Sequence, residues 1–150
     1  MSHLLKISEA GSLALHTMVL LACQSQKTLS SHEIASFIGC SEAHLSKVMQ
    51  RLAKTGLVTS RRGPGGGFSL KKRPEDTSLM EVFEAIEGPL SPTECLLARP
   101  VCNGNCILGE LTRGIDNQAR EYFAQKMLSA FTGAFDANTD SEGAPERRLP

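Results

Sequence analysis

Three cysteines lie close together in the second half of the chain, in the segment Cys95-Leu-Leu-Ala-Arg-Pro-Val-Cys102-Asn-Gly-Asn-Cys106. The spacers contain Pro100 and Gly104, residue types that favour a loop over a helix. A loop can bend three sulfur atoms towards one centre, and thiolates are soft ligands that select zinc, copper(I) or an iron–sulfur cluster. The spacing therefore predicts a metal-binding loop.

The other two thiols give a weaker signal. Cys23 lies in an apolar run and Cys40 precedes a predicted helix, and free cysteines commonly serve as small buried hydrophobic residues. The total of five cysteines is odd, which favours metal or redox chemistry over a disulfide framework. Without an apolar run of about 18 residues and without a signal-peptide pattern, the sequence leads us to expect a cytoplasmic protein with no membrane partner.

The formal net charge of zero conceals two halves of opposite charge. Residues 1–73 contain ten Lys and Arg against three Asp and Glu, a net of +7, and residues 74–150 contain six against thirteen, a net of −7. A basic half can bind phosphates by releasing counterions, whereas the acidic half would be repelled by DNA. The alternative is that both halves are solvated faces without a partner.

Periodic apolar residues and helix caps predict three helices in the basic half. The first covers about 9–24, and the second follows the capping box Ser30-x-x-Glu33 and ends at Gly39. Ser41 caps a third helix, which ends at Gly56 and whose inward residues are Leu45, Val48, Met49 and Leu52.

A glycine-rich basic hairpin follows the third helix. Two short strands, 57–60 and 68–70, flank Arg61-Arg62-Gly63-Pro64-Gly65-Gly66-Gly67. Helix, short helix, turn, helix and hairpin is the order of a winged helix-turn-helix, so we expect a mainly α fold with a small β-hairpin wing.

Such a module reads double-stranded DNA with the start of its second helix. Among its residues, Ser41, His44 and Ser46 can bond base edges, while Lys47 and Arg51 suit phosphates. At the wing, Arg61 and Arg62 can enter a minor groove, and Gly65 and Gly66 permit close backbone approach. The alternative is that the two arginines are only solvated hairpin charges.

The acidic half is predicted to contain a capped helix at about 78–87, the cysteine loop, and a long amphipathic helix at about 107–133. Little else in the chain can cover that long helix, so we expect it to form a homodimer; the alternative is packing on its own domain. Residues 136–150 are predicted to be a disordered tail. The predicted organisation is a DNA-binding domain at 1–73, a cysteine loop and dimerisation helix at 74–135, and the tail.

The segment Leu52-Ala-Lys-Thr-Gly-Leu-Val-Thr-Ser-Arg-Arg-Gly-Pro-Gly-Gly-Gly-Phe-Ser-Leu70 resembles the signature of the Rrf-two family of bacterial winged-helix transcription regulators, over roughly residues 4–133. The resemblance implies dimerisation through the long C-terminal helix and an iron–sulfur cluster on three cysteines before that helix. Cys95, Cys102 and Cys106 occupy that place. Their spacing is less even than in relatives that sense iron–sulfur status or nitric oxide, and other members have lost the cluster.

Three cysteines leave one ligand position open in a closed four-ligand site. Some relatives use a histidine three residues after the last cysteine, where this chain has Gly109. Others recruit a ligand from the first helix of the partner subunit, which the resemblance places at Ser12 or His16, and imidazole is the better donor. The alternatives are Glu94 as ligand, or His16 as an ordinary surface or core imidazole.

Two functional hypotheses follow. The first is a transcriptional regulator whose DNA affinity is controlled by an iron–sulfur cluster, 2Fe–2S or 4Fe–4S, that senses redox state, nitric oxide or iron–sulfur status. The second is an electron-transfer or zinc-binding protein without a DNA role, for which the basic wing would have no purpose. Enzymatic function is not expected, because no paired carboxylates or nucleophile–base arrangement stands out. The sequence leaves open the operator, the direction of regulation and the signal.

Overall fold

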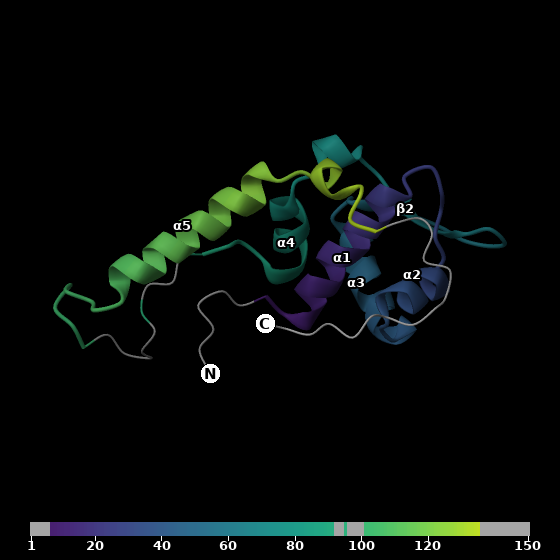
Figure 1. The fold of residues 1–150 in the computed structure, drawn as a ribbon. Helices are drawn as coiled ribbons and strands as arrows, with labels where there is room; N and C mark the ends of the chain where they lie inside the picture. The colour runs from purple at the N-terminus through teal and green to yellow at the C-terminus, as the bar shows by residue number, and fades with distance from the viewer. Residues whose placement is uncertain (1–6, 92–94, 96–100, 136–150) are drawn as a thin grey trace, which may run out of the picture.

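The computed structural model describes residues 7–91, 95 and 101–135, and it contains the predicted order of helices followed by a hairpin (Figure 1). The predicted mainly helical winged helix-turn-helix is therefore confirmed. No helix within the described ranges is long and apolar enough to cross a membrane. The elements are α1 (Glu9–Cys23), α2 (Ser31–Ile38), α3 (Glu42–Lys54), β1 (Val58–Arg61), β2 (Gly67–Leu70), the 3-10 turn η1 (Pro74–Asp76), α4 (Leu79–Glu87), α5 (Gly109–Gln125) and the 3-10 turn η2 (Leu128–Phe131).

The core is built around α1, which packs against α2, α3, α4 and β2. This helix is apolar on most of its circumference because neighbours cover it on several sides, and Met18, Leu20 and Leu21 are almost fully buried. The same core includes Phe83 of α4 and Phe123 of α5, whose rings stack at 5.1 Å. It thus crosses the predicted boundary between 73 and 74, and the functional division at that point stays a prediction.

The helix-turn-helix is positioned by local caps, as the sequence predicts. The Ser30 hydroxyl accepts from the Glu33 amide at 3.2 Å while the Glu33 carboxylate accepts from the Ser30 amide at 2.7 Å, which starts α2. Gly39 ends α2 with a φ of 79°, a left-handed conformation that favours glycine. Ser41 then caps α3 by accepting from the His44 amide at 3.2 Å.

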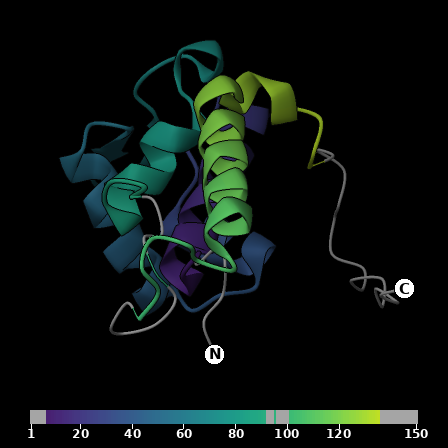
Figure 2. The ribbon, with the colours of Figure 1, turned by 90° about the vertical axis from the view of Figure 1, so that its left-hand side faces the viewer.

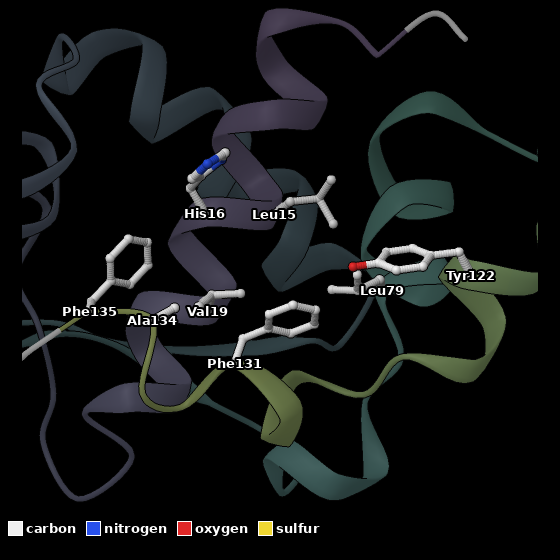
Figure 3. A pocket seen from close by; sticks show the side chains of 8 residues that line it. All are labelled: Leu15, His16, Val19, Leu79, Tyr122, Phe131, Ala134 and Phe135. Carbon is white, nitrogen blue, oxygen red and sulfur yellow. The ribbon is translucent and has the colours of Figure 1, made fainter. Parts of the chain in front are cut away.

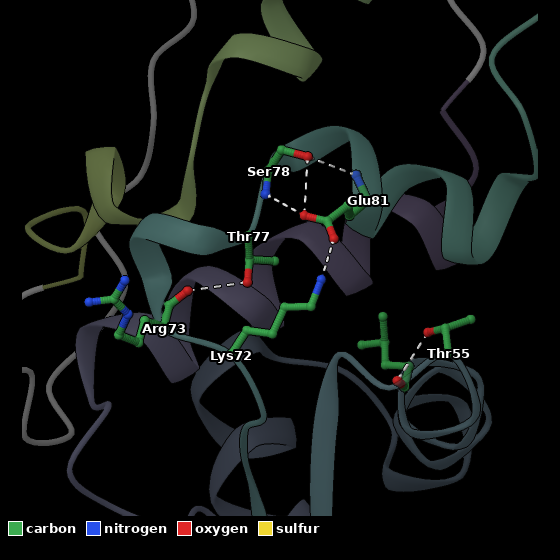
Figure 4. A network of polar contacts seen from close by, with 7 residues as sticks. Thr55, Lys72, Arg73, Thr77, Ser78 and Glu81 are labelled. Carbon is green, nitrogen blue, oxygen red and sulfur yellow. Dashed lines mark hydrogen bonds and ion pairs between the residues drawn. The ribbon is translucent and has the colours of Figure 1, made fainter.

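A second capping box starts α4 and is extended by a lysine (Figure 4). The Glu81 carboxylate accepts from the Ser78 amide at 3.0 Å and from Lys72 Nζ at 2.6 Å. Partial burial raises the pKa of Glu81, but the hydrogen bonds from Lys72 and Ser78 outweigh it, so that the pKa lies below its ordinary value. An ionised Glu81 therefore stabilises the folded chain.

We expect Glu81→Gln to lower the free energy of unfolding by about 1 kcal/mol at neutral pH, the usual size of a cap contribution. Because the folded pKa is depressed, this stabilisation is complete above the pKa of the unfolded chain and is lost as the pH falls below about 4.5. Urea denaturation of both proteins should therefore show a difference that shrinks on acidification. A difference that grows below that pH would contradict the assigned sign.

The long C-terminal helix is shorter than predicted. It was expected over 107–133, but α5 begins at Gly109 and ends at Gln125, and η2 follows as a separate turn. The reason is a non-local pairing: the Leu79 amide donates to the Lys126 carbonyl at 2.8 Å, and the Leu128 amide donates to the Thr77 carbonyl at 2.9 Å. This short bridge anchors the end of α5 to the start of α4, while the other end of α5 reaches beyond the body of the domain (Figure 1), so that α5 lies in front of the other helices in the view of Figure 2.

Candidate nucleic-acid interface and metal-ligand residues

Helix α3 presents a polar face at its start. Ser41 and Lys47 are exposed, and His44 and Ser46 are partly buried. Gln50, which the sequence analysis did not select, is exposed three residues after Lys47 and therefore shares its helix face. A glutamine amide can bond an adenine edge bidentately. The spacing of exposed residues along the predicted helix could have identified it.

Two carboxylates lie beside this face. Glu42 Oε1 is 2.8 Å from His32 Nδ1, which links α3 to α2, and Glu9 Oε1 is 3.4 Å from His44 Nδ1, which links α1 to α3. The His44 side chain, predicted to reach base edges, is thus held by a residue at the first turn of α1.

Arg51 has a partner within the protein. The sequence analysis predicted that Arg51 contacts phosphates, but its guanidinium donates to the Ile86 carbonyl at the end of α4. This hydrogen bond fixes the end of α3 against the end of α4. The phosphate contact of Arg51 stays a prediction.

The wing is a two-stranded antiparallel hairpin in which Val58 pairs with Leu70 and Arg61 with Gly67. Arg61 and Arg62 are exposed at its tip, and within the described part of the chain neither forms an ion pair with a carboxylate. The hairpin is held to the domain through Leu29, whose amide and carbonyl exchange hydrogen bonds with Phe68 at 3.0 and 2.7 Å.

The wing glycines differ in their structural demands. A Cβ on Gly67, which has a φ of 147°, would lie 2.3 Å from the Leu29 carbonyl oxygen, and one on Gly66 would lie 2.4 Å from the Arg61 carbonyl oxygen. These two glycines are required by the shape of the hairpin itself. A Cβ on Gly65 would meet nothing within 4 Å, but its φ of 70° is a left-handed conformation that itself favours glycine. The DNA contacts of Gly65 and Gly66 stay predictions.

The three clustered cysteines lie between α4 and α5. Cys95 and Cys106 are partly buried and Cys102 is exposed. Cys106 is seated against the first turn of α5, where the Gly109 amide donates to its carbonyl at 3.2 Å and a Cβ on Gly109 would lie 3.0 Å from the Cys106 Cβ. Three thiols on one segment fit a soft metal chemically, but no three Cys, His, Asp or Glu residues in the described ranges are grouped closely enough to bind one. Glu94 lies outside those ranges.

His16 lies on α1, at an open apolar groove of about 290 Å³ (Figure 3). The ring nitrogen Nδ1 lies 2.7 Å from the Ser12 carbonyl oxygen, to which an Nδ1–H can donate. That tautomer leaves Nε2 as a free acceptor, the arrangement common in metal-binding histidines. The groove is lined by Leu15, His16, Val19, Leu79, Tyr122, Phe131, Ala134 and Phe135.

The two remaining cysteines pack against the core, where their structural role stays a prediction. Cys23 Sγ lies 3.5 Å from the Phe131 carbonyl oxygen, and Cys40 is partly buried at the turn between α2 and α3.

Comparison with known proteins gives one consistent result. The model of a family described as Rrf2, iron-dependent transcriptional regulator, matches residues 7–133. The HTH-type transcriptional regulator IscR of Photorhabdus laumondii is 31% identical over 127 residues, which cover 83% of this chain and 77% of that protein. An rrf2-like HTH-type transcriptional regulator of Rhodobacter capsulatus is 35% identical over 94 residues, and the match spans 60% of this chain and 63% of that protein's length.

The fold is also similar to solved structures. CymR (YrzC), the global cysteine regulator of B. subtilis, is 28% identical and aligns with a TM-score of 0.74, covering 88% of this chain and 99% of that one. The similarity thus extends from the winged helix-turn-helix into α5.

Proposed function

The chain belongs to the Rrf2 (Rrf-two) family of DNA-binding transcriptional regulators, and we propose that its affinity for operator DNA is controlled by an iron–sulfur cluster. The family consists of regulators rather than enzymes. The observation that carries the proposal is the presence of three thiols on the segment that joins α4 to α5, in a chain that also has an exposed basic wing. The proposed site of action is the cytoplasm.

For DNA binding, we infer that α3 enters the major groove while the wing contacts the adjacent backbone or minor groove. Ser41, His44 and Ser46 would face base edges and Lys47 the phosphates. Arg61 and Arg62 are exposed at the wing tip, which supports their role as the wing's phosphate or minor-groove contacts.

We further propose a homodimer through α5. Ile107 is 96% exposed in the single chain, and Leu111 and Tyr122 are about half exposed. Leu111 and Tyr122 lie on α5, which reaches beyond the domain (Figure 1), and Ile107 lies just before its start; burying the three against a second copy would remove apolar surface from water. A two-fold dimer would present two α3 helices to a symmetric operator.

Cys95, Cys102 and Cys106 would hold the cluster as thiolates, and His16 of the other chain would supply its Nε2 as the fourth ligand. The cluster would supply sensitivity to oxidation, nitric oxide or iron supply. The free Nε2 supports this role for His16, since its Nδ1–H is directed to the Ser12 carbonyl.

Anaerobic purification with iron and sulfide analysis, followed by DNA titration of the loaded and cluster-free forms, tests the proposal. A brown protein with iron and sulfide, and a difference in affinity between the two forms, would support it. A colourless protein that contains zinc would favour the structural-zinc alternative. A coloured protein whose two forms bind DNA equally would overturn control by the cluster and leave electron transfer as the competing function.

If His16 is the fourth ligand, His16→Ala should alter the visible spectrum and shorten the cluster lifetime at least several-fold. Protonation competes with metal for imidazole, so the wild-type site should also become more labile as the pH falls. Ser12→Ala is the comparison on the same helix, because it keeps the Ser12 carbonyl beside His16 Nδ1 and removes the hydroxyl that is the other candidate ligand there. Loss of the cluster in Ser12→Ala, with an unaltered spectrum in His16→Ala, would assign the ligand to Ser12. Loss of the cluster in Glu94→Ala, with an unaltered spectrum in His16→Ala, would assign the ligand to Glu94.

A further inference from the structure

The last turn of α4 and the residues directly after it lie where the chain enters the cysteine-bearing segment, and residues of α3 and α5 and the N-cap of α1 hold them. Arg51 of α3 donates to the Ile86 carbonyl, and Arg120 of α5 donates to the Leu90 carbonyl. Ser8, the N-cap of α1, donates to the Glu87 carboxylate from its hydroxyl and, at 3.0 Å, from its amide. This group of contacts is called the α4 junction below.

Glu87 occupies a place that the sequence keeps open. A Cβ built on Gly11 of α1 would lie 2.3 Å from Glu87 Oε1, so any other residue at this position would require the carboxylate to shift. A negative charge at the N-terminus of a helix is also electrostatically favourable. Both features fix the end of α4 to the first turn of α1.

The same first turn of α1 reaches the DNA-reading helix. Glu9 directly follows Ser8, and its carboxylate lies 3.4 Å from His44 Nδ1 at the start of α3. The end of α4 therefore contacts α3 by two routes: directly through Arg51 in the last turns of α3, and through Ser8 and Glu9 to His44 in its first turn.

We propose that the α4 junction transmits the state of the cysteine segment to α3, with Arg51 and Glu87 as positioning residues for DNA recognition. This inference rests on the proposed function, because it takes the cysteine segment as the input. The first thiol, Cys95, follows Leu90 by five residues, so it lies within about 18 Å of the junction even along a fully extended chain.

The junction suits transmission because its parts are rigid. Ile86 is 4% exposed and belongs to the core, so the last turn of α4 cannot shift without moving its packed neighbours. A displacement of the segment after Leu90 would strain or break the bonds to Arg51 and Ser8 together. Loss of both would release the two ends of α3 from the positions that the junction fixes.

The test compares Arg51→Ala and Glu87→Gln with Lys54→Ala, which removes an exposed cation from the same end of α3. For each protein, DNA affinity is measured in the cluster-loaded and cluster-free forms, and amide hydrogen exchange is measured over 42–54 in the cluster-free form. Arg51→Ala and Glu87→Gln should retain the visible spectrum, bring the ratio of the two affinities several-fold closer to one, and speed exchange in α3. Lys54→Ala should change neither the ratio nor the exchange.

The outcomes separate the two hypotheses. A wild-type ratio of one overturns the proposed function, whatever the variants do. A wild-type ratio far from one that persists in Arg51→Ala and Glu87→Gln, with unchanged exchange in α3, overturns the junction. Glu87→Gln keeps an amide oxygen that can accept from Ser8, so it should fold even if Arg51→Ala does not. It loses the negative charge at the N-terminus of α1, so it should hold the first turn of α1 less firmly than the carboxylate does.

Discussion

Replacing both wing arginines, Arg61 and Arg62, by alanine should weaken binding to operator DNA by at least about 100-fold at physiological salt. Both side chains are exposed at the hairpin tip, and a dimer would lose four cationic contacts at once. If each neutralises one phosphate, the slope of log affinity against log salt should fall by about 3 to 4. Fluorescence anisotropy titrations of labelled operator at several salt concentrations would measure both effects.

The matched control is Arg73→Ala. Arg73 carries the same charge but already pairs with Glu75 and Asp76, at 3.3 and 2.7 Å. Its removal should change the salt slope less than either single wing substitution. An operator affinity that is unchanged in the Arg61→Ala, Arg62→Ala double variant, with normal helical content, would remove the wing from DNA binding.

Much of the DNA-binding half could be predicted from local patterns, because the features that define it are local. Ser30, Ser41 and Ser78 act as caps through hydrogen bonds that span only three residues, and Gly39 ends α2 through its own φ. The predicted strands differ from β1 and β2 by one residue, since their glycine-rich loop fixes the hairpin.

The features that sequence reasoning missed depend on partners far along the chain. Nothing near Lys126 marks the end of a helix, and α5 ends there because its carbonyl accepts from the Leu79 amide. Arg51 was predicted to contact phosphates because of its positive charge and its place on α3. Nothing in the sequence indicates that its guanidinium also donates to the Ile86 carbonyl, 35 positions away. Gly66 was predicted to allow close approach to DNA, and that contact stays a prediction; the structure adds a demand within the hairpin, because a Cβ there would lie 2.4 Å from the Arg61 carbonyl oxygen.

For the candidate metal site, the sequence shows which types of ligand are present but not how they are arranged in space. Thiol spacing predicts which side chains could bind a metal, whereas in the described ranges no three Cys, His, Asp or Glu residues are grouped closely enough to bind one. The groove beside His16 is lined by residues of α1, α4, α5 and the segment 131–135, and it is open in the single chain (Figure 3). A ligand set that includes His16 would therefore need groups from outside this groove.

Changing Cys102 to alanine should remove nearly all iron and sulfide from anaerobically purified protein, together with the visible absorption. Cys102 is the most exposed of the three clustered thiols, so its loss should leave the folded domain intact and affect the metal alone. Two thiolates and one imidazole would leave a cluster too weakly held, because each lost ligand exposes the metal to water. The variant should bind DNA with the affinity of cluster-free wild type.

The comparison variants are Cys95→Ala and Cys106→Ala, which should lose the cluster equally, and Cys23→Ala, which should keep it. Cys23 packs against the core and lies 3.5 Å from the Phe131 carbonyl oxygen, so its replacement should cost about 1 kcal/mol of stability without changing the metal content. Iron and sulfide analysis beside a denaturation curve separates these two effects. Full retention of iron and sulfide in Cys102→Ala would show that the three thiols do not share a centre, and control of DNA binding would then have to come from another part of the chain.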